Sequence, residues 1–105
     1  MKKVRITVLE NTFHPELALK YAKPGFGPCR MHTKGQEFIS NGWRKPEGFC
    51  DNAWKSIQEY VFTLSHGGSD FYDGWMRDKH TAVLSCNDGV RPVIFLVELA
   101  EETEQ

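Results

Sequence analysis

Three cysteines are the residues of this sequence best suited to chemistry, because each lies beside a turn instead of inside an apolar run. Cys29 ends the segment GFGPC, Cys50 ends PEGFC, and Cys86 precedes the turn residues NDG. A cysteine acts as a nucleophile or a metal ligand through its thiolate, which positive charge and helix N-termini favour. The sequence therefore predicts a site lined by thiols, if folding brings these three residues together.

Cys50 and Arg91 are the predicted catalytic residues. Cys50 lies at, or one residue before, the start of the longest predicted helix, where free backbone N–H groups and the helix dipole favour an anion. Arg91 follows Cys86 across a turn, and its guanidinium can assist that thiol or another. Asp51 acts in the opposite direction, since a neighbouring negative charge disfavours a thiolate. The competing interpretation is that Cys50 is a small buried residue, as free cysteines often are.

The same cysteines also suggest a metal site. Cys29 and His32 are separated by two residues, a spacing that can chelate one ion. Cys50 and Cys86 would complete a Cys₃His shell for zinc, or leave an open position for iron. The sequence contains no C-x-x-C pair, so folding would have to bring isolated ligands together. The alternative is that His32 is a surface histidine.

A second group of polar residues lies in the segment 65–80, which shows little regular pattern. His66, Asp70 and Asp73 can bind a hard cation or act as an acid–base pair. Long loops of this kind are often lids or binding loops, although a surface excursion held by its aromatic residues is the simpler interpretation. A further hypothesis is that the three tryptophans line a pocket beside the thiols. These residues are Trp43, Trp54 and Trp75.

Composition argues against several classes of function. The 105 residues carry a formal net charge of -1 and no basic stripe, whereas nucleic-acid binding relies on clustered Lys and Arg. No apolar run approaches the ~20 residues that cross a bilayer. The first residues lead directly into a strand pattern, so no signal peptide is expected. Because an odd number of cysteines without an export signal is typical of a reducing compartment, we expect a cytoplasmic protein.

Hydrophobic periodicity predicts the elements that position these residues. Alternating or continuous apolar runs predict strands over residues 4–9, 36–40, 81–86 and 90–99, and Asp88-Gly89 is a hairpin signal between the last two. Pro15 fits the first turn of a short helix. A longer helix, with Asp51 or Asn52 as its N-cap, is predicted from a stripe of apolar residues at helical spacing. The stripe consists of Ala53, Ile57, Tyr60, Val61 and Leu64.

The predicted order is strand, helix, strand, helix, strand, strand, in a single domain over residues 1–105. This order indicates an α+β fold, a small mixed or antiparallel sheet of about four strands with two helices packed on one face. We expect the first strand to lie beside the last, because these two runs are the most apolar.

Four blocks of the sequence are similar to a known family. They are GFGPC at 25–29, Gly35 with Phe38, PEGFC followed by Ala53-Trp54, and CNDGVRPVIF at 86–95. Through these blocks, which span nearly the whole chain, the protein resembles a small three-cysteine family from anaerobic bacteria and archaea, with members of about this length. The resemblance implies membership of that family, and it implies no particular activity, ligand or catalytic residue.

Two classes of function follow. The first is a cytoplasmic protein whose cysteine-lined site binds a soft metal ion or performs thiol or redox chemistry on a small molecule. The alternative is a non-catalytic binding or assembly module that forms homo-oligomers through an edge strand and buries its cysteines as structural residues. A third hypothesis is an enzyme that uses His66 and Asp73, with the thiols as bystanders.

Overall fold

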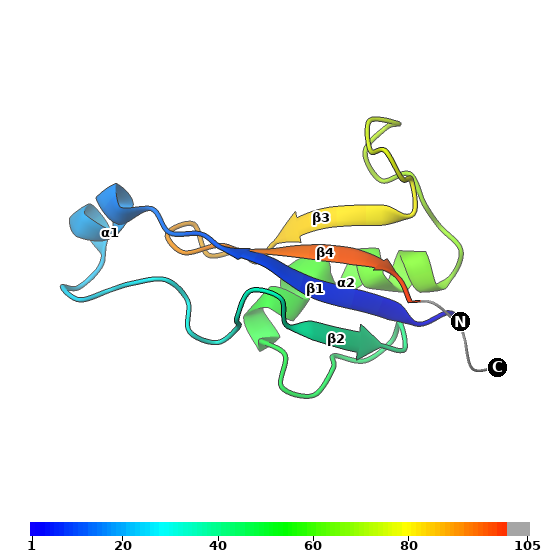
Figure 1. Ribbon diagram of the computed structural model, residues 1–105, viewed down its shortest axis with the longest axis horizontal. Helices are drawn as coiled ribbons and strands as arrows, with labels where there is room; N and C mark the ends of the chain where they lie inside the picture. The colour runs from blue at the N-terminus through cyan, green and yellow to red at the C-terminus, as the bar shows by residue number, and fades with distance from the viewer. Residues whose placement is uncertain (101–105) are drawn as a thin grey trace.

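A four-stranded antiparallel sheet with one long helix against it forms the centre of the computed structural model (Figure 1), which describes residues 1–100. The predicted α+β class and the predicted order of elements are confirmed; residues 101–105 of the predicted domain lie outside the described part. The elements are β1 (Val4–Asn11), α1 (Pro15–Tyr21), β2 (Glu37–Ser40), α2 (Asp51–Ser65), β3 (Thr81–Ser85) and β4 (Val93–Leu99).

The strands lie in the order β2-β1-β4-β3, so the first and last strands are central neighbours, as predicted. Alternate residues of β1 and β4 point to one face of the sheet and are buried there, including the pairs Ile6 with Val97 and Val8 with Phe95. The helix α2 covers this face and contacts β1, β3 and β4. Its buried stripe is the predicted one in four of five positions, namely Ala53, Ile57, Val61 and Leu64.

The short helix α1 does not pack on the sheet face. It lies beyond the end of the sheet, on an arm that lengthens the molecule to 50 Å (Figure 1). Ala18 is buried, whereas Leu17, Leu19 and Tyr21 are exposed. Of the two helices, α2 is the one that packs against the inner face, through its contacts with β1, β3 and β4. The expectation of two helices on one face therefore holds for α2 alone.

The start of α2 differs from its predicted form. Its N-cap residue is Cys50, and no side chain caps the helix. Asp51 and Asn52 both lie inside the first turn, where the Asp51 carboxylate pairs with Lys45 Nζ at 3.3 Å. The predicted cap by Asp51 or Asn52 is therefore wrong, and backbone N–H groups at this helix end are left for other partners.

The connection between β3 and β4 is also wider than predicted. The strands end at Ser85 and begin again at Val93, so the segment 86–92 is a loop. The cause is the Asp88 carboxylate, whose Oδ1 accepts the backbone N–H groups of Val90 and Arg91 at 2.8 and 3.0 Å. These two donors are thereby removed from the strand ladder, which places Arg91 in a loop instead of a strand.

We predict that Gly42→Ala destabilises the protein more than Gly48→Ala does. Both glycines lie between β2 and α2 with positive φ angles, +92° and +83°, so either alanine costs about 1 kcal/mol in backbone strain. A Cβ at Gly42 would also overlap the Ser65 side chain at the end of α2, whereas a Cβ at Gly48 meets open space.

Overpacking of this kind adds roughly 1–3 kcal/mol. Urea denaturation of the two variants measures the difference, and equal losses of unfolding free energy would contradict the close approach of Gly42 to α2.

Candidate functional site

The candidate site lies at the end of the sheet where β1 stops and β4 begins, and Asn11 organises it. Asn11 is the last residue of β1 and pairs with Val93, the first residue of β4. Its Nδ2 donates to the backbone carbonyls of Cys29, at 3.2 Å, and His32, at 2.7 Å. One amide therefore holds the segment 29–32 against the sheet. Asn11 follows the alternating run 4–9, and apolar periodicity gives no sign that its amide bonds a distant loop.

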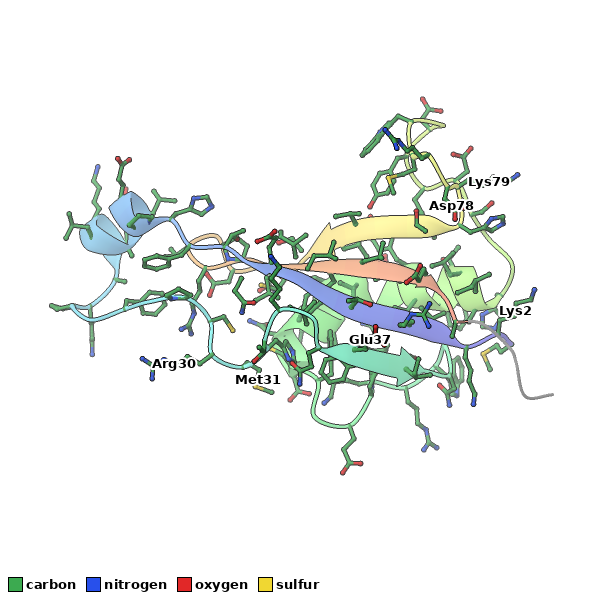
Figure 2. All side chains as sticks on the ribbon, in the orientation of Figure 1. Lys2, Arg30, Met31, Glu37, Asp78 and Lys79 are labelled. Atoms are coloured by element: carbon green, nitrogen blue, oxygen red, sulfur yellow. The ribbon has the colours of Figure 1, made fainter. Side chains whose placement is uncertain are left out.

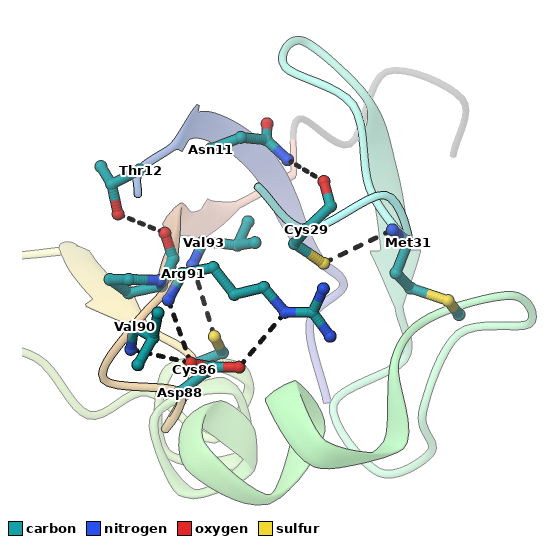
Figure 3. A network of polar contacts seen from close by, with 10 residues as sticks. Asn11, Thr12, Cys29, Met31, Cys86, Asp88, Val90, Arg91 and Val93 are labelled. Carbon is teal, nitrogen blue, oxygen red and sulfur yellow. Dashed lines mark hydrogen bonds and ion pairs between the residues drawn. The ribbon is translucent and has the colours of Figure 1, made fainter. Parts of the chain in front are cut away.

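Cys86 and Cys29 both present their sulfur atoms to backbone donors (Figure 3). Val93 N–H donates to Cys86 Sγ at 3.3 Å, and Met31 N–H donates to Cys29 Sγ at 3.4 Å. A donor directed at sulfur also stabilises the negative charge that the sulfur carries when it reacts. Because Val93 pairs with Asn11 and Asn11 bonds the Cys29 carbonyl, the two cysteines belong to one connected network.

Arg91 bridges the two loops that carry these cysteines. Its Nε pairs with Asp88 Oδ2 at 3.4 Å, and its Cζ lies 4.3 Å from the ring centroid of Phe26, in the loop that leads to Cys29. Figure 3 shows the Arg91 side chain extending toward Cys29. The Arg91 backbone N–H lowers the pKa of the Asp88 carboxyl, with smaller help from the Val90 N–H and the guanidinium. An ionised Asp88 thus holds the guanidinium in place.

Cys50 joins this region through its backbone and His32. The Cys50 N–H donates to His32 Nε2 at 3.2 Å. His32 is only 3% exposed, and its ring lies 5.0 Å from Phe49 and 5.9 Å from Phe95 between ring centroids. The interpretation of His32 as a surface histidine is therefore wrong. Its imidazole supplies the acceptor for a donor at the start of α2 that no side-chain cap satisfies.

The hydrogen bond from Cys50 fixes the tautomer of a neutral His32. Because Nε2 accepts, the ring proton resides on Nδ1. This atom is buried and has no hydrogen-bond partner among residues 1–100. Burial lowers the pKa of His32 from its ordinary value of 6.5, with partial opposition from the Gln36 side chain. The lone pair that a metal would need is therefore already engaged in this structure.

The predicted site residues thus share one end of the fold without all converging on a point. The first turn of α2 reaches the 86–92 loop through Asn87 Nδ2 and Asn52 Oδ1, 3.5 Å apart. All three cysteines are free, partly buried, and packed against the same apolar core. Within residues 1–100, no three His, Cys, Asp or Glu side chains are grouped so that they could hold a metal ion.

His66 and Asp70 of the 65–80 segment make local contacts. His66 lies against Phe62, with 4.1 Å between ring centroids, and Asp70 Oδ1 accepts the Gly74 N–H at 2.9 Å. Aromatic contacts hold this excursion, which projects away from the sheet (Figure 1). Trp75 packs on Tyr72 at 4.7 Å within it. Trp75 therefore takes no part in a pocket with the other tryptophans, which line a hollow on α2.

No protein-family model, curated protein or solved structure matches this chain. The resemblance to the three-cysteine family, carried by the blocks around Cys29, Cys50 and Cys86, stays a prediction. Neither helix in the described residues has the length and apolar character of a membrane span.

We predict that His32 makes the folded protein less stable below pH 6.5. The unfolded chain binds a proton at His32 near its ordinary pKa of 6.5, whereas the buried ring in the folded protein binds one only at lower pH. The free energy of unfolding therefore has its full value above pH 6.5, where His32 is neutral in both states. It decreases as the pH falls toward the pKa of His32 in the folded protein. Urea denaturation from about pH 8 down to about pH 5 measures this slope.

The matched variants are His32→Gln and His14→Gln, because His14 is exposed. We expect His32→Gln to lower stability at high pH and to flatten the profile, and His14→Gln to keep the slope of the unaltered protein. Parallel profiles for His32→Gln and the unaltered protein would show that His32 does not carry the effect.

Proposed function

We propose that the protein carries a thiol site for nucleophilic chemistry on a small anionic molecule, formed by Cys29 and Cys86 with Arg91. The observation that supports this proposal is the position of the guanidinium, which is held between the loops of both thiols by Asp88 and Phe26. Positive charge close to a thiol favours its reactive form, and it also attracts an anion to the same place.

The chemistry of Arg91 indicates the class of substrate. Asp88 pairs with Nε, so that within the described residues the two Nη groups are left for a ligand. A guanidinium binds carboxylate and phosphate oxygens through paired N–H donors. The substrate is therefore a small molecule that carries such a group near an electrophilic atom. In the step itself, a sulfur of Cys29 or Cys86 forms a bond to that atom, the thiol proton passes to solvent, and the displaced group leaves with the bonding electrons.

Cys50 has a supporting position in this proposal. Its backbone N–H is bound to His32, and it starts α2 beside the 86–92 loop. The metal form of the site, with zinc or iron on Cys29, Cys50, Cys86 and His32, receives less support because His32 Nε2 already accepts a hydrogen bond. Because an odd number of cysteines is typical of a reducing compartment, we propose that the protein acts in the cytoplasm.

Self-assembly is a second candidate, favoured by apolar residues on the sheet face that α2 leaves open. Ile39 on β2 and Val83 on β3 are 47% and 45% exposed there, and both strands are sheet edges. Exposed edges of this kind pair readily with another chain. Analytical ultracentrifugation of the unaltered protein and of a variant with all three cysteines changed to serine tests this role. A dimer that survives the triple change supports assembly, and a monomer in both proteins refutes it.

We predict that Cys29 and Cys86 react preferentially with an anionic electrophile, and that Arg91 is the cause. Iodoacetate and iodoacetamide alkylate a thiol by the same displacement of iodide, and they differ in charge. We expect their rate ratio at these two cysteines to exceed the ratio for a free small thiol. In Arg91→Gln the ratio should fall about fivefold, as expected from the loss of roughly 1 kcal/mol of charge interaction. Mass spectrometry of timed samples locates and measures each adduct.

The matched control is Arg77→Gln, which removes the same charge from an exposed position in the 65–80 segment. Its rate ratio should equal that of the unaltered protein. Equal ratios in all three proteins, or failure of both thiols to react in the folded protein, would refute the thiol site.

A further inference from the structure

A hollow on the outer side of α2 is separate from the cysteine site and has three aromatic residues in its lining. It has a volume of about 450 Å³, within the range of small-molecule sites. Two of its aromatic residues lie far apart in the chain but stack on each other: Trp43 and Phe62, with 5.7 Å between centroids and 29° between planes. The lining residues are Gly42, Trp43, Trp54, Gln58, Glu59, Phe62 and Thr63.

Hydrogen bonds to its own backbone and to that of its neighbour hold Trp43 in this position. Asn41 Oδ1 accepts the backbone N–H groups of Trp43 and Arg44, both at 3.0 Å. Gly42 lies close enough to Ser65 that no larger residue fits. Together these contacts hold the connection after β2 against the end of α2. The Trp43 ring is therefore positioned by the fold, although 64% of the residue is exposed to solvent.

The lining of the hollow carries a negative charge. Glu59 is the one ionisable residue in the lining, and its carboxylate forms no ion pair within residues 1–100. No lysine or arginine contributes to the lining. Glu59 also borders a neighbouring hollow that contains Tyr60 and Phe71. Glu59 is thus a lining residue of two neighbouring hollows that both contain aromatic residues.

We propose that this hollow binds a small organic cation, such as a quaternary or methylated ammonium group. The face of an aromatic ring attracts a cation, most strongly for tryptophan, and a carboxylate nearby adds a charge that a neutral ligand cannot use. A methylated ammonium suits the hollow better than a bare one, because its methyl groups gain contact with apolar rings and lose little hydration. This binding site goes beyond the proposed thiol chemistry and does not depend on it.

Choline and its neutral isostere 3,3-dimethylbutan-1-ol provide the test, because they have nearly the same shape and differ by one charge. Titration of each into the ¹⁵N-labelled protein follows the indole N–H signals by NMR. We expect choline to shift the signals of Trp43 and Trp54 and to leave that of Trp75 unchanged. Choline should bind at least about fivefold more tightly than the isostere, as expected for roughly 1 kcal/mol of cation–aromatic attraction.

Two variants separate the contributions of charge and ring. Glu59→Gln should weaken choline binding about fivefold and leave the isostere unaffected, whereas Glu47→Gln, which alters another exposed acid outside the hollow, should change neither. Trp43→Leu keeps an apolar side chain but removes the aromatic face, so it should weaken choline more than the isostere. Equal affinities for both ligands, no effect of Glu59→Gln, or equal shifts at all three tryptophans would refute the proposal. None of these outcomes bears on the alkylation experiment at Arg91.

Discussion

The packing of α2 across β1 and β4 is the interaction on which the rest of the structure depends. It buries the apolar stripe of the helix against the inner face of the sheet, and each large side chain removed from water contributes about 1.5–3 kcal/mol. The same packing sets the direction of the helix, so its first turn meets the end of the sheet. Phe49 and Phe95, 5.3 Å apart between ring centroids, join the two there. The three cysteines pack against the core near this end, although they do not converge on one point.

Backbone groups, more than side-chain pairs, assemble the candidate site. Asn11 bonds two carbonyls, His32 accepts a backbone N–H, and both Cys29 and Cys86 accept backbone N–H groups at sulfur. Four of these bonds are partly buried, so they satisfy main-chain groups that have lost contact with water. Figure 2 shows side chains outside this end spread over the arm and the 65–80 segment. The sheet end is thus the place where loops from three parts of the chain are joined.

The features of the fold that can be predicted from the sequence are those that local hydrophobic periodicity determines. Alternation along β1 and the stripe from Ala53 to Leu64 predict both elements, and the apolar character of β4 predicts its place beside β1. Burial of His32, by contrast, depends on Phe49 and Phe95, which lie far away in the sequence. The same is true of the Trp43–Phe62 stack and of the two carbonyls that Asn11 bonds. The loop at 86–92 was missed because one carboxylate competes with the strand ladder for two N–H groups, which apolar patterning does not reveal.

The central pairing of β1 with β4 has a consequence for the order of events during synthesis. Val4 pairs with Leu99, and the Ala100 N–H donates to the Lys3 carbonyl at 2.9 Å, so the ladder joins opposite ends of the described chain. Pairings so distant in sequence form slowly, because a long loop must close first. While the ribosome is still adding β4, β1 lacks its main partner, and Cys29 and Cys50 have no finished sheet end to pack against. The thiols of Cys29 and Cys50 are therefore exposed to solvent in the nascent chain until β4 has been made and has paired with β1.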